Sequence, residues 1–360
     1  MATRTSPTTD VAGPLAVLSE EPRRNTYRCH AQCGVPFGVM RTLAPGRDQR
    51  FLIDDYEPVY LRTWREGRLD TKVEAAMEEL ADCKACPRDC GVNRLLDERG
   101  VCHTGRWPYV ASAFLHRGEE DCLRGQNGSG TIFLSYCNLK CVFCQNWDIS
   151  SQEAGRELAA DQIAELMLRL QAEGCHNINF VTPEHVAAQL VEAIAVAVPL
   201  GLEVPIVYNT SAYDAMASLE LMDGLVDIYM PDFKFWEPES SRHLARAGDY
   251  PQRARAAIVE MHRQVGVLRF GRDGLARRGV LLRHLVMPGH VDEAAAIFRW
   301  LHGAVSPDTY VNIMGQYRPE HRVVGAERYA DIDRRPDHTE IVAAFEAARE
   351  AGLWRLESAE

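Results

Sequence analysis

Residues 131–146 read TIFLSYCNLKCVFCQN, a short apolar run that leads directly into a cysteine-rich loop. The run TIFLS predicts a buried β-strand over 131–135, because such runs suit a strand covered on both faces. Cys137, Cys141 and Cys144 follow within eight positions, and no fourth cysteine stands nearby. Thiolates select iron–sulfur clusters, zinc and cuprous copper. The end of this strand therefore predicts a metal site that is one protein ligand short.

The same strand begins an alternation of strands and helices. Apolar runs predict five further strands, at 177–181, 204–208, 226–230, 279–287 and 309–314. Helical periodicity predicts intervening helices at 160–174, 185–198 and 213–224, within 238–265, and at 291–303. Thr182 and Pro183 are expected to form the N-cap and first turn of the second helix. Such alternation requires parallel strands with right-handed crossovers, so we expect an α/β fold. A partial (β/α)6 barrel fits, and an open doubly wound sheet is the alternative.

Polar and charged side chains follow the predicted strands at their carboxyl ends, where parallel α/β folds place their chemistry. They are Asn209, Ser211, Asp232, Lys234, Arg283, His284 and Gln316. Each one alone is explained equally well by a helix cap or a salt bridge. Six strand ends that face the same way beside a cysteine loop favour a shared site.

The loop CNLKCVFC resembles the signature loop of radical S-adenosylmethionine enzymes, which has three cysteines and an aromatic residue before the third. The resemblance covers about residues 125–320 and includes a partial barrel. It implies that Cys137, Cys141 and Cys144 hold a [4Fe–4S] cluster and that S-adenosylmethionine chelates the fourth iron. It also implies that Phe143 shields the cluster from water. A zinc site that lacks a ligand and three incidental cysteines are the alternatives.

That resemblance implies a radical reaction. An electron donor such as flavodoxin or ferredoxin reduces the cluster, and the cofactor is cleaved to a 5′-deoxyadenosyl radical. The radical then abstracts hydrogen from a substrate, while the protein positions the reactants and excludes water. The superfamily often has a Gly-Gly-Glu stretch after the second strand. This chain has Thr182, Pro183 and Glu184 there, so Thr182 or backbone carbonyls would have to hold the methionyl amine.

A narrower resemblance links several segments to the branch of proteins similar to pyruvate formate-lyase activating enzyme. They include CPRDCGVNR, NINFVTPEH, YNTSAYD, VDIYMPDFK, LLRHLVMPG and YVNIMGQYRP. The resemblance implies that Asn209 and Ser211 contact the ribose or the methionine carboxylate. It places the stretch from Asp232 to Lys234 near cofactor and substrate. Arg283 and His284 would hold an anionic group.

A second cysteine group, CKACPRDCGVNRLLDERGVC, contains Cys83, Cys86, Cys90 and Cys102. Four thiols in twenty positions predict a metal site, in which Cys122 could replace Cys102. Zinc would make a closed structural site, whereas iron would make a fully ligated auxiliary [4Fe–4S] cluster for electron relay. A disulfide pair is the remaining alternative.

Composition limits the classes of function. The 360 residues are 46% hydrophobic and 25% charged, which is enough for a large core. A net charge of −11 argues against a protein that holds long nucleic acid through its phosphates. No apolar run is long enough to span a bilayer, and the N-terminus lacks the pattern of a signal peptide. We expect a soluble cytoplasmic protein, in which 11 cysteines favour metal or redox chemistry over disulfides.

The sequence divides into four regions. They are a flexible leader at 1–25, a cysteine-rich region at 26–125, the barrel at 126–320 and a helical extension at 321–360. Cys29 and Cys33 flank His30 in a weaker pattern, and Cys175 is expected to be buried as a small apolar side chain.

The leading hypothesis is a radical S-adenosylmethionine enzyme with an unknown substrate. That substrate is either a glycyl radical enzyme or a small molecule or protein residue unrelated to glycyl radicals. A non-catalytic iron–sulfur or zinc protein is the hypothesis from a different class, although a closed structural site has no need of an open iron.

Overall fold

The computed structural model describes residues 48–357. The predicted leader, Cys29, His30 and Cys33 lie outside this range.

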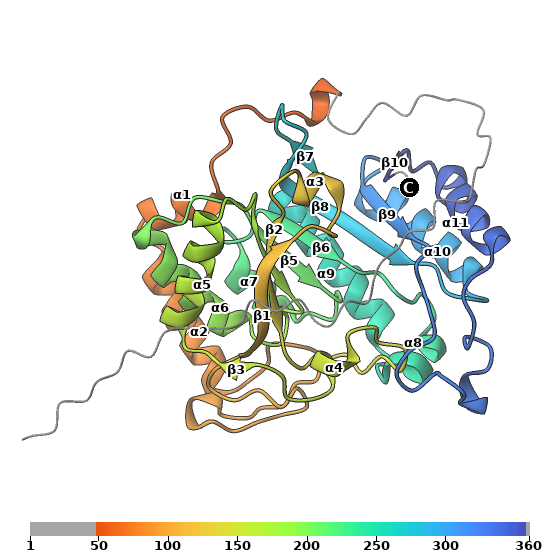
Figure 1. The fold of residues 1–360 in the computed structure, drawn as a ribbon, viewed down its shortest axis with the longest axis horizontal. Helices are drawn as coiled ribbons and strands as arrows, with labels where there is room; N and C mark the ends of the chain where they lie inside the picture. Colours follow the sequence, from red (N-terminus) through yellow and green to blue (C-terminus); the bar gives the residue numbers. More distant parts are fainter. Residues whose placement is uncertain (1–47, 358–360) are drawn as a thin grey trace, which may run out of the picture.

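A mostly parallel sheet forms the centre of the molecule, with helices packed along it (Figure 1). Its six central strands are β2 (Ser129–Leu134), β4 (Ile178–Val181), β5 (Ile206–Thr210), β6 (Ile228–Pro231), β8 (Ala276–Leu285) and β9 (Tyr310–Met314). All neighbours in this series pair in parallel. The six predicted strands are confirmed. Their order never reverses along the sheet, as it would in a doubly wound fold, so the architecture is the partial barrel.

The helices between these strands follow the predicted periodicity, except that the single helical stretch expected within 238–265 is divided into two helices, α8 and α9. They are α5 (Ala160–Ala172), α6 (Ala187–Ala197), α7 (Met216–Met222), α8 (Pro238–Ala245), α9 (Tyr250–Val265) and α10 (Val291–Trp300). Shorter helical segments are the 3-10 turn η3 (Val198–Leu200), the π-helical segment η4 (Leu301–Val305) and, after β9, the 3-10 turn η5 (Glu327–Tyr329). Apolar faces of α5 and α6 pack with β2, β4 and β5 in one core. A second core lies under α8 to α10.

The predicted N-cap at Thr182 was wrong. Helix α6 begins only at Ala187, and its N-cap residue Val186 makes no side-chain cap hydrogen bond. Thr182 has a φ of 62°, in the left-handed region that a β-branched residue rarely adopts. It turns the chain sharply at the end of β4, and the Val186 amide then donates to Pro183 O at 2.9 Å. The segment is a tight turn that carries Glu184 into the interior.

Four further strands extend the sheet. β1 (Tyr109–His116) pairs antiparallel with β2 and with β3 (Arg156–Glu157), and β7 (Arg269–Phe270) pairs antiparallel with β8. β10 (Arg355–Leu356) pairs in parallel with β9. Sequence patterning missed all four, because β1 is only partly buried and the others are two residues long.

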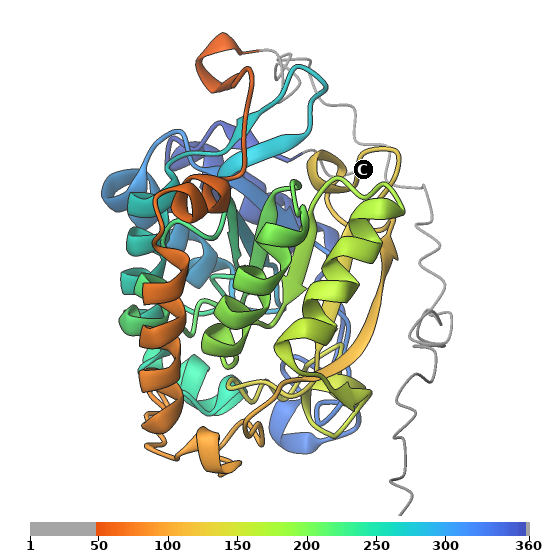
Figure 2. The same cartoon turned by 90° about the vertical axis from the view of Figure 1, so that its left-hand side faces the viewer.

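The regions on either side of the barrel pack onto it. η1 (Gln49–Phe51), α1 (Val59–Arg65), α2 (Leu69–Ala81) and η2 (Arg94–Leu96) precede β1. Figure 2 shows α2 running along the helices of the barrel, where it packs against α6 and α7. At the other end, α11 (His338–Glu350) packs against α10. The region 321–360 therefore contributes a strand, β10, to the sheet as well as a helix.

Two short helices lie at opposite ends of the strands. α4 (Trp147–Ser150) follows the cysteine loop at the carboxyl ends, and α3 (Asp121–Arg124) lies at the amino ends (Figure 1). Between residues 48 and 357, no helix has both the length and the hydropathy needed to cross a membrane.

Candidate active site

The cysteine loop, residues 135–146, leaves the carboxyl end of β2 and rests on α8. Tyr136 turns the chain with a φ of 65°. The amides of Lys140 and Val142 donate to the last carbonyls of α8, Ala245 O at 3.2 Å and Leu244 O at 2.8 Å. These bonds fix the loop across the mouth of the barrel.

Cys137, Cys141 and Cys144 are partly exposed and lie in one group. The amide of Leu139 donates to Cys137 Sγ at 3.3 Å, and Cys144 Sγ lies 3.2 Å from Ser150 Oγ. Although the residues are partly exposed, their thiol groups point inward, and burial raises the pKa of all three thiols, that of Cys141 to about 12. Without a metal the thiols are therefore protonated, and metal binding must displace their protons.

Glu184 lies beside this group and was missed as a candidate by the sequence reasoning. The carboxylate is fully buried, and its Oε1 accepts from Ser211 Oγ at 2.6 Å. Its Oε2 has no partner among the described residues. Burial raises the pKa of Glu184, although the hydrogen bond from Ser211 opposes this. A buried carboxylate with one unpaired oxygen is a ready acceptor for a cationic ligand.

A charged group from three other strands completes the site. Arg283, on β8, donates through Nε to Asp232 Oδ1 at 2.8 Å and through Nη2 to Asn209 Oδ1 at 2.7 Å. Lys234 Nζ pairs with the other oxygen of Asp232. Burial would raise the pKa of Asp232, but Arg283 and Lys234 lower it overall. The structure thus brings together four residues that sequence analysis selected separately.

Two adjacent acids, Glu119 and Glu120, reach Arg283 from the amino ends of the strands. Their carboxylates lie 3.8 Å and 3.7 Å from Arg283 Nη1. Asn179 donates to Glu119 at 2.7 Å, and Asn312 donates to Glu120 at 3.1 Å. Burial and the neighbouring Glu119 charge raise the pKa of Glu120. In the sequence this pair resembles an ordinary solvated turn.

One predicted residue, His284, lies outside this site. His284 follows Arg283 on β8 and so faces the opposite side of the sheet, where its ring contacts Phe298 at 5.3 Å. Its Nδ1 hydrogen-bonds Phe233 O at 2.8 Å, and burial lowers its pKa to about 4. The imidazole is neutral near pH 7, so His284 does not join Arg283 in holding an anionic group.

Three further predicted residues lie at the edge of the site formed by the cysteine loop, Glu184 and Arg283. Phe143 is buried, and its ring lies 6.1 Å from that of Phe235, in the core beneath the loop. Thr182 donates its amide to Asn209 O at 2.9 Å, at the turn described above. Gln316 accepts a hydrogen bond from Gln145, a loop residue, at its main-chain oxygen. Shielding by Phe143 and cofactor contact by Thr182 stay predictions.

The second cysteine group lies next to the first. Cys83, Cys86 and Cys102 are buried and Cys90 is partly exposed. All nine cysteines between residues 48 and 357 are free, which contradicts the disulfide alternative there. Cys122 does not replace Cys102, because it belongs to a separate core with Leu123, Phe270 and others. Cys175 is buried in the barrel core, as expected.

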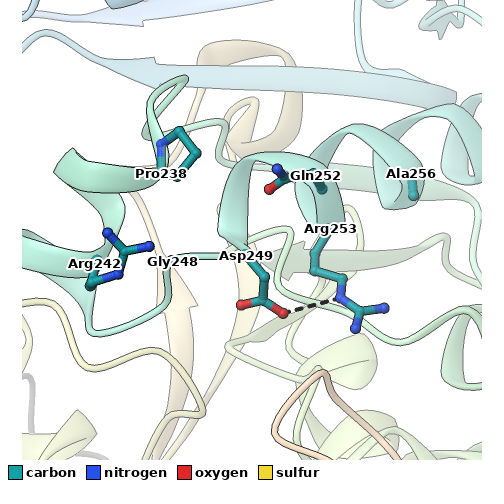
Figure 3. A pocket seen from close by; sticks show the side chains of 7 residues that line it. All are labelled: Pro238, Arg242, Gly248, Asp249, Gln252, Arg253 and Ala256. Carbon is teal, nitrogen blue, oxygen red and sulfur yellow. Dashed lines mark hydrogen bonds and ion pairs between the residues drawn. The ribbon is translucent and has the colours of Figure 1, made fainter.

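An open groove of about 720 Å³ lies between α8 and α9 (Figure 3). Arg253 Nε donates to Asp249 Oδ2 at 3.2 Å across part of it. None of the site residues above lines the groove, whose lining consists of Pro238, Arg242, Gly248, Asp249, Gln252, Arg253 and Ala256. We assign it no function.

The chain is similar to one known superfamily and, over most of its length, to one other protein. Residues 131–301, from β2 to the end of α10, match the Radical SAM superfamily. The protein of Methanocaldococcus jannaschii called "Uncharacterized protein MJ0674" is 32% identical over 308 residues, covering 83% of this chain and 84% of its own.

Solved structures show weaker similarity. Methylornithine synthase (PylB) is 14% identical with a TM-score of 0.43, covering 84% of this chain and 80% of its own. SuiB of Streptococcus suis, bound to S-adenosylmethionine, is 13% identical with a TM-score of 0.41 and covers 62% of this chain. The chain spans about half of SuiB, 49% of its length.

Proposed function

The chain belongs to the radical SAM superfamily, and from this premise we propose that it abstracts hydrogen from a substrate bound at the carboxyl ends of its strands. The family implies a [4Fe–4S] cluster and S-adenosylmethionine. The observation that carries the proposal is the unpaired Oε2 of Glu184 beside Cys137. An orphaned buried carboxylate oxygen is costly, and an N–H of the methionyl amine of S-adenosylmethionine would satisfy it.

The donor set fits these two groups. Cys137, Cys141 and Cys144 would hold the cluster, and three thiolates leave one of four irons for a chelating ligand. When bound, the cluster and S-adenosylmethionine supply one-electron chemistry that yields a 5′-deoxyadenosyl radical. Flavodoxin or ferredoxin is the proposed class of electron donor.

The remaining residues fix the positions of the charged side chains in the site. Ser211 fixes the orientation of Glu184 through its 2.6 Å hydrogen bond. Although burial opposes it, the carboxylate of Asp232 raises the pKa of Lys234, so the ammonium stays charged beside Cys141. Arg283 ties Asp232 to Asn209 and prevents either side chain from turning away. Carboxylates therefore balance both cations, and the Lys234 ammonium is held next to the cluster thiols.

Cofactor cleavage tests the proposal. Anaerobically reconstituted protein with dithionite should convert S-adenosylmethionine to 5′-deoxyadenosine and methionine. Cys141→Ala should abolish this, whereas Cys175→Ala should retain it, because Cys175 lies in the barrel core. Wild-type protein that cleaves no more than Cys141→Ala would mean that the chain is a binding protein only.

Within this function, activation of a glycyl radical enzyme is one candidate. The similarity of YNTSAYD and VDIYMPDFK to the activating-enzyme branch supports it. Radical modification of a small molecule or another protein residue is the second candidate. Deuterium transfer from labelled substrates into 5′-deoxyadenosine distinguishes them. A glycyl radical enzyme labelled at glycine should transfer deuterium under the first candidate and none under the second.

A further inference from the structure

The second cysteine group surrounds a buried arginine, Arg94. Only 1% of its surface is exposed. Its Nη2 donates to Cys102 Sγ at 3.2 Å and its Nη1 donates to His185 O at 2.6 Å, while Nε has no partner among the described residues. A guanidinium removed from water must be balanced by negative charge close by. Glu79 is one acidic neighbour of Arg94. Neutral thiols add no further negative charge, whereas metal-bound thiolates would add it.

Three of the four cysteines are buried almost as deeply as the arginine. The exposed fractions of Cys83, Cys86 and Cys102 are 2%, 6% and 3%. A tight turn brings the first two together: the amide of Asp89 donates to Cys86 O and that of Gly91 to Cys83 O, both at 3.0 Å. This is the compact knuckle that closely spaced cysteine ligands require.

Cys90 closes the group on its outer side. Its Sγ accepts from the amide of Val101 at 3.5 Å, directly before Cys102. Gly100 packs against it so closely that a β-carbon there would lie 2.7 Å from Cys90 Sγ. Cys90 is also the most exposed of the four thiols, which makes its side the natural point for electrons to enter.

The position of this group, next to the first cysteine group, suits an electron carrier better than a structural ion. Zinc bonds to sulfur at about 2.3 Å, so its ligands converge on one point. A four-iron cluster instead holds its cysteines at separate corners of a cube, and hydrogen bonds to the sulfurs tune it.

We propose that Cys83, Cys86, Cys90 and Cys102 ligate a second [4Fe–4S] cluster, that Arg94 is its counter-cation, and that it passes electrons to the cluster at Cys137, Cys141 and Cys144. A one-electron donor reduces the second cluster. That cluster returns to its oxidised state as the electron moves on, so the relay consumes nothing else. The relay rests on the proposed function, whereas the second cluster does not.

One residue, Asn138, separates the two cysteine groups. It is fully buried, and it is a side-chain hydrogen-bond partner of Cys86. Its Oδ1 lies 3.9 Å from Cys137 Sγ. Arg88 Nε donates to Asn138 O at 2.9 Å and fixes the residue in place. The two cysteine groups therefore lie on either side of one buried side chain, an arrangement that suits direct electron transfer between two clusters.

Iron and sulfide content tests the second cluster without any turnover. The full chain, reconstituted anaerobically, should hold about eight irons and eight sulfides. The double variant Cys86→Ala/Cys102→Ala and the triple variant Cys137→Ala/Cys141→Ala/Cys144→Ala should each hold about four. Cys175→Ala is the matched control and should hold the full complement.

Two results would overturn the second cluster. One is about four irons in wild type with no loss in the double variant. The other is one zinc per chain that the double variant loses. A failure of cofactor cleavage in wild type with about eight irons present would overturn the proposed function and leave the second cluster standing.

Arg94 is tested by the reduction potential of the second cluster. The triple variant isolates its paramagnetic signal. In that background Arg94→Met should make the midpoint potential more negative, because a cation and a sulfur hydrogen bond are lost, and Arg94→Lys should recover part of the shift. An unchanged potential at full iron content would overturn the counter-cation assignment. If Arg94→Met does not fold, the smaller shift in Arg94→Lys decides the same point.

The relay is tested with a slow protein donor. With reduced ferredoxin as the donor, the cluster at Cys137, Cys141 and Cys144 should become reduced at least tenfold more slowly in the double variant than in Cys175→Ala. Dithionite should reduce both variants equally. Equal rates with ferredoxin would overturn the relay.

Discussion

Single buried acids determine much of the site's behaviour, and Glu184 is the most informative of them. Its residue type was visible in the sequence, but its importance depends on Ser211 and Cys137, which lie in other segments. In the sequence alone, Glu184 stands only where the superfamily often has a Gly-Gly-Glu stretch. The same reasoning applies to Glu119 and Arg94, whose burial depends on distant strands and loops.

Glu184→Gln should retain the cluster but weaken cofactor binding. Gln keeps the hydrogen bond with Ser211 and removes the negative charge, so S-adenosylmethionine affinity should fall by at least tenfold, about 1.4 kcal/mol. Equilibrium binding to anaerobic protein of equal iron content measures the effect. Glu192→Gln is a suitable control, since Glu192 pairs with Arg106 outside the site. Equal affinities for the two variants would contradict the assignment.

Asp214 should make stability depend on pH. Burial, and then the neighbouring Glu184, raise the pKa of Asp214 to about 8, from the ordinary value of 3.8. The folded state therefore keeps a proton that the unfolded state releases. Its contribution to stability is complete below about pH 4 and is lost as the pH rises through about 8.

Asp214→Asn removes this titration. Its free energy of unfolding relative to wild type should rise between pH 5 and pH 8, by at most about 1.4 kcal/mol per pH unit. Urea unfolding at several pH values under anaerobic conditions measures the difference. Parallel profiles for the two proteins would show that Asp214 is ionised when folded.

Whole elements were the most predictable part of the molecule. Strands buried on both faces and helices with one apolar face leave strong periodic signals, and all six central strands follow them. The edge strands β3, β7 and β10 are fixed by pairing with distant partners, which no local pattern encodes. The start of α6 was missed for a similar reason, because Thr182 adopts a left-handed turn that Glu184 and β5 impose.

Strand β8 depends on one glycine. Gly279 has a φ of 127°, and a β-carbon there would lie 2.4 Å from both Leu268 Cα and Val267 O. Gly279→Ala should cost more than about 3 kcal/mol of unfolding free energy, because main chain cannot move aside cheaply. Denaturant unfolding measures this cost.

Gly201→Ala is the matched control. Gly201 also has a positive φ, 100°, but a β-carbon added there would meet no atom within 4 Å. Only the conformational cost remains, about 1–2 kcal/mol. A Gly279→Ala variant no less stable than Gly201→Ala would contradict the packing argument.

At the scale of the whole molecule, the two ends of the described chain close on each other. The Arg355 guanidinium of β10 lies 3.7 Å from the centre of the Phe51 ring. It also donates to Leu268 O at 2.8 Å and to Asp308 O at 2.9 Å. The helical extension expected at 321–360 is thus joined to the N-terminal region through the sheet.

Arg355→Ala should lower the free energy of unfolding by about 2–4 kcal/mol, because one buried and one partly buried carbonyl lose their donor and the Phe51 ring loses its cation–π contact. Arg272→Ala is the control: Arg272 pairs with Asp54 at 2.8 Å on the exposed surface. Such pairs contribute about 0–1 kcal/mol. Thermal unfolding compares the variants, and equal midpoints would show that the two ends do not stabilise each other.

The cysteine loop itself depends on the rest of the chain for its shape. Its amides bond to α8, and its Val142 carbonyl accepts from the amide of Arg322, far away in sequence. A synthetic peptide of residues 135–146 would carry the three ligands without the scaffold that orients them. A protein that carried this loop as a graft would therefore have a recognisable motif. It would lack the contacts with the barrel that orient the three ligands and leave one iron accessible.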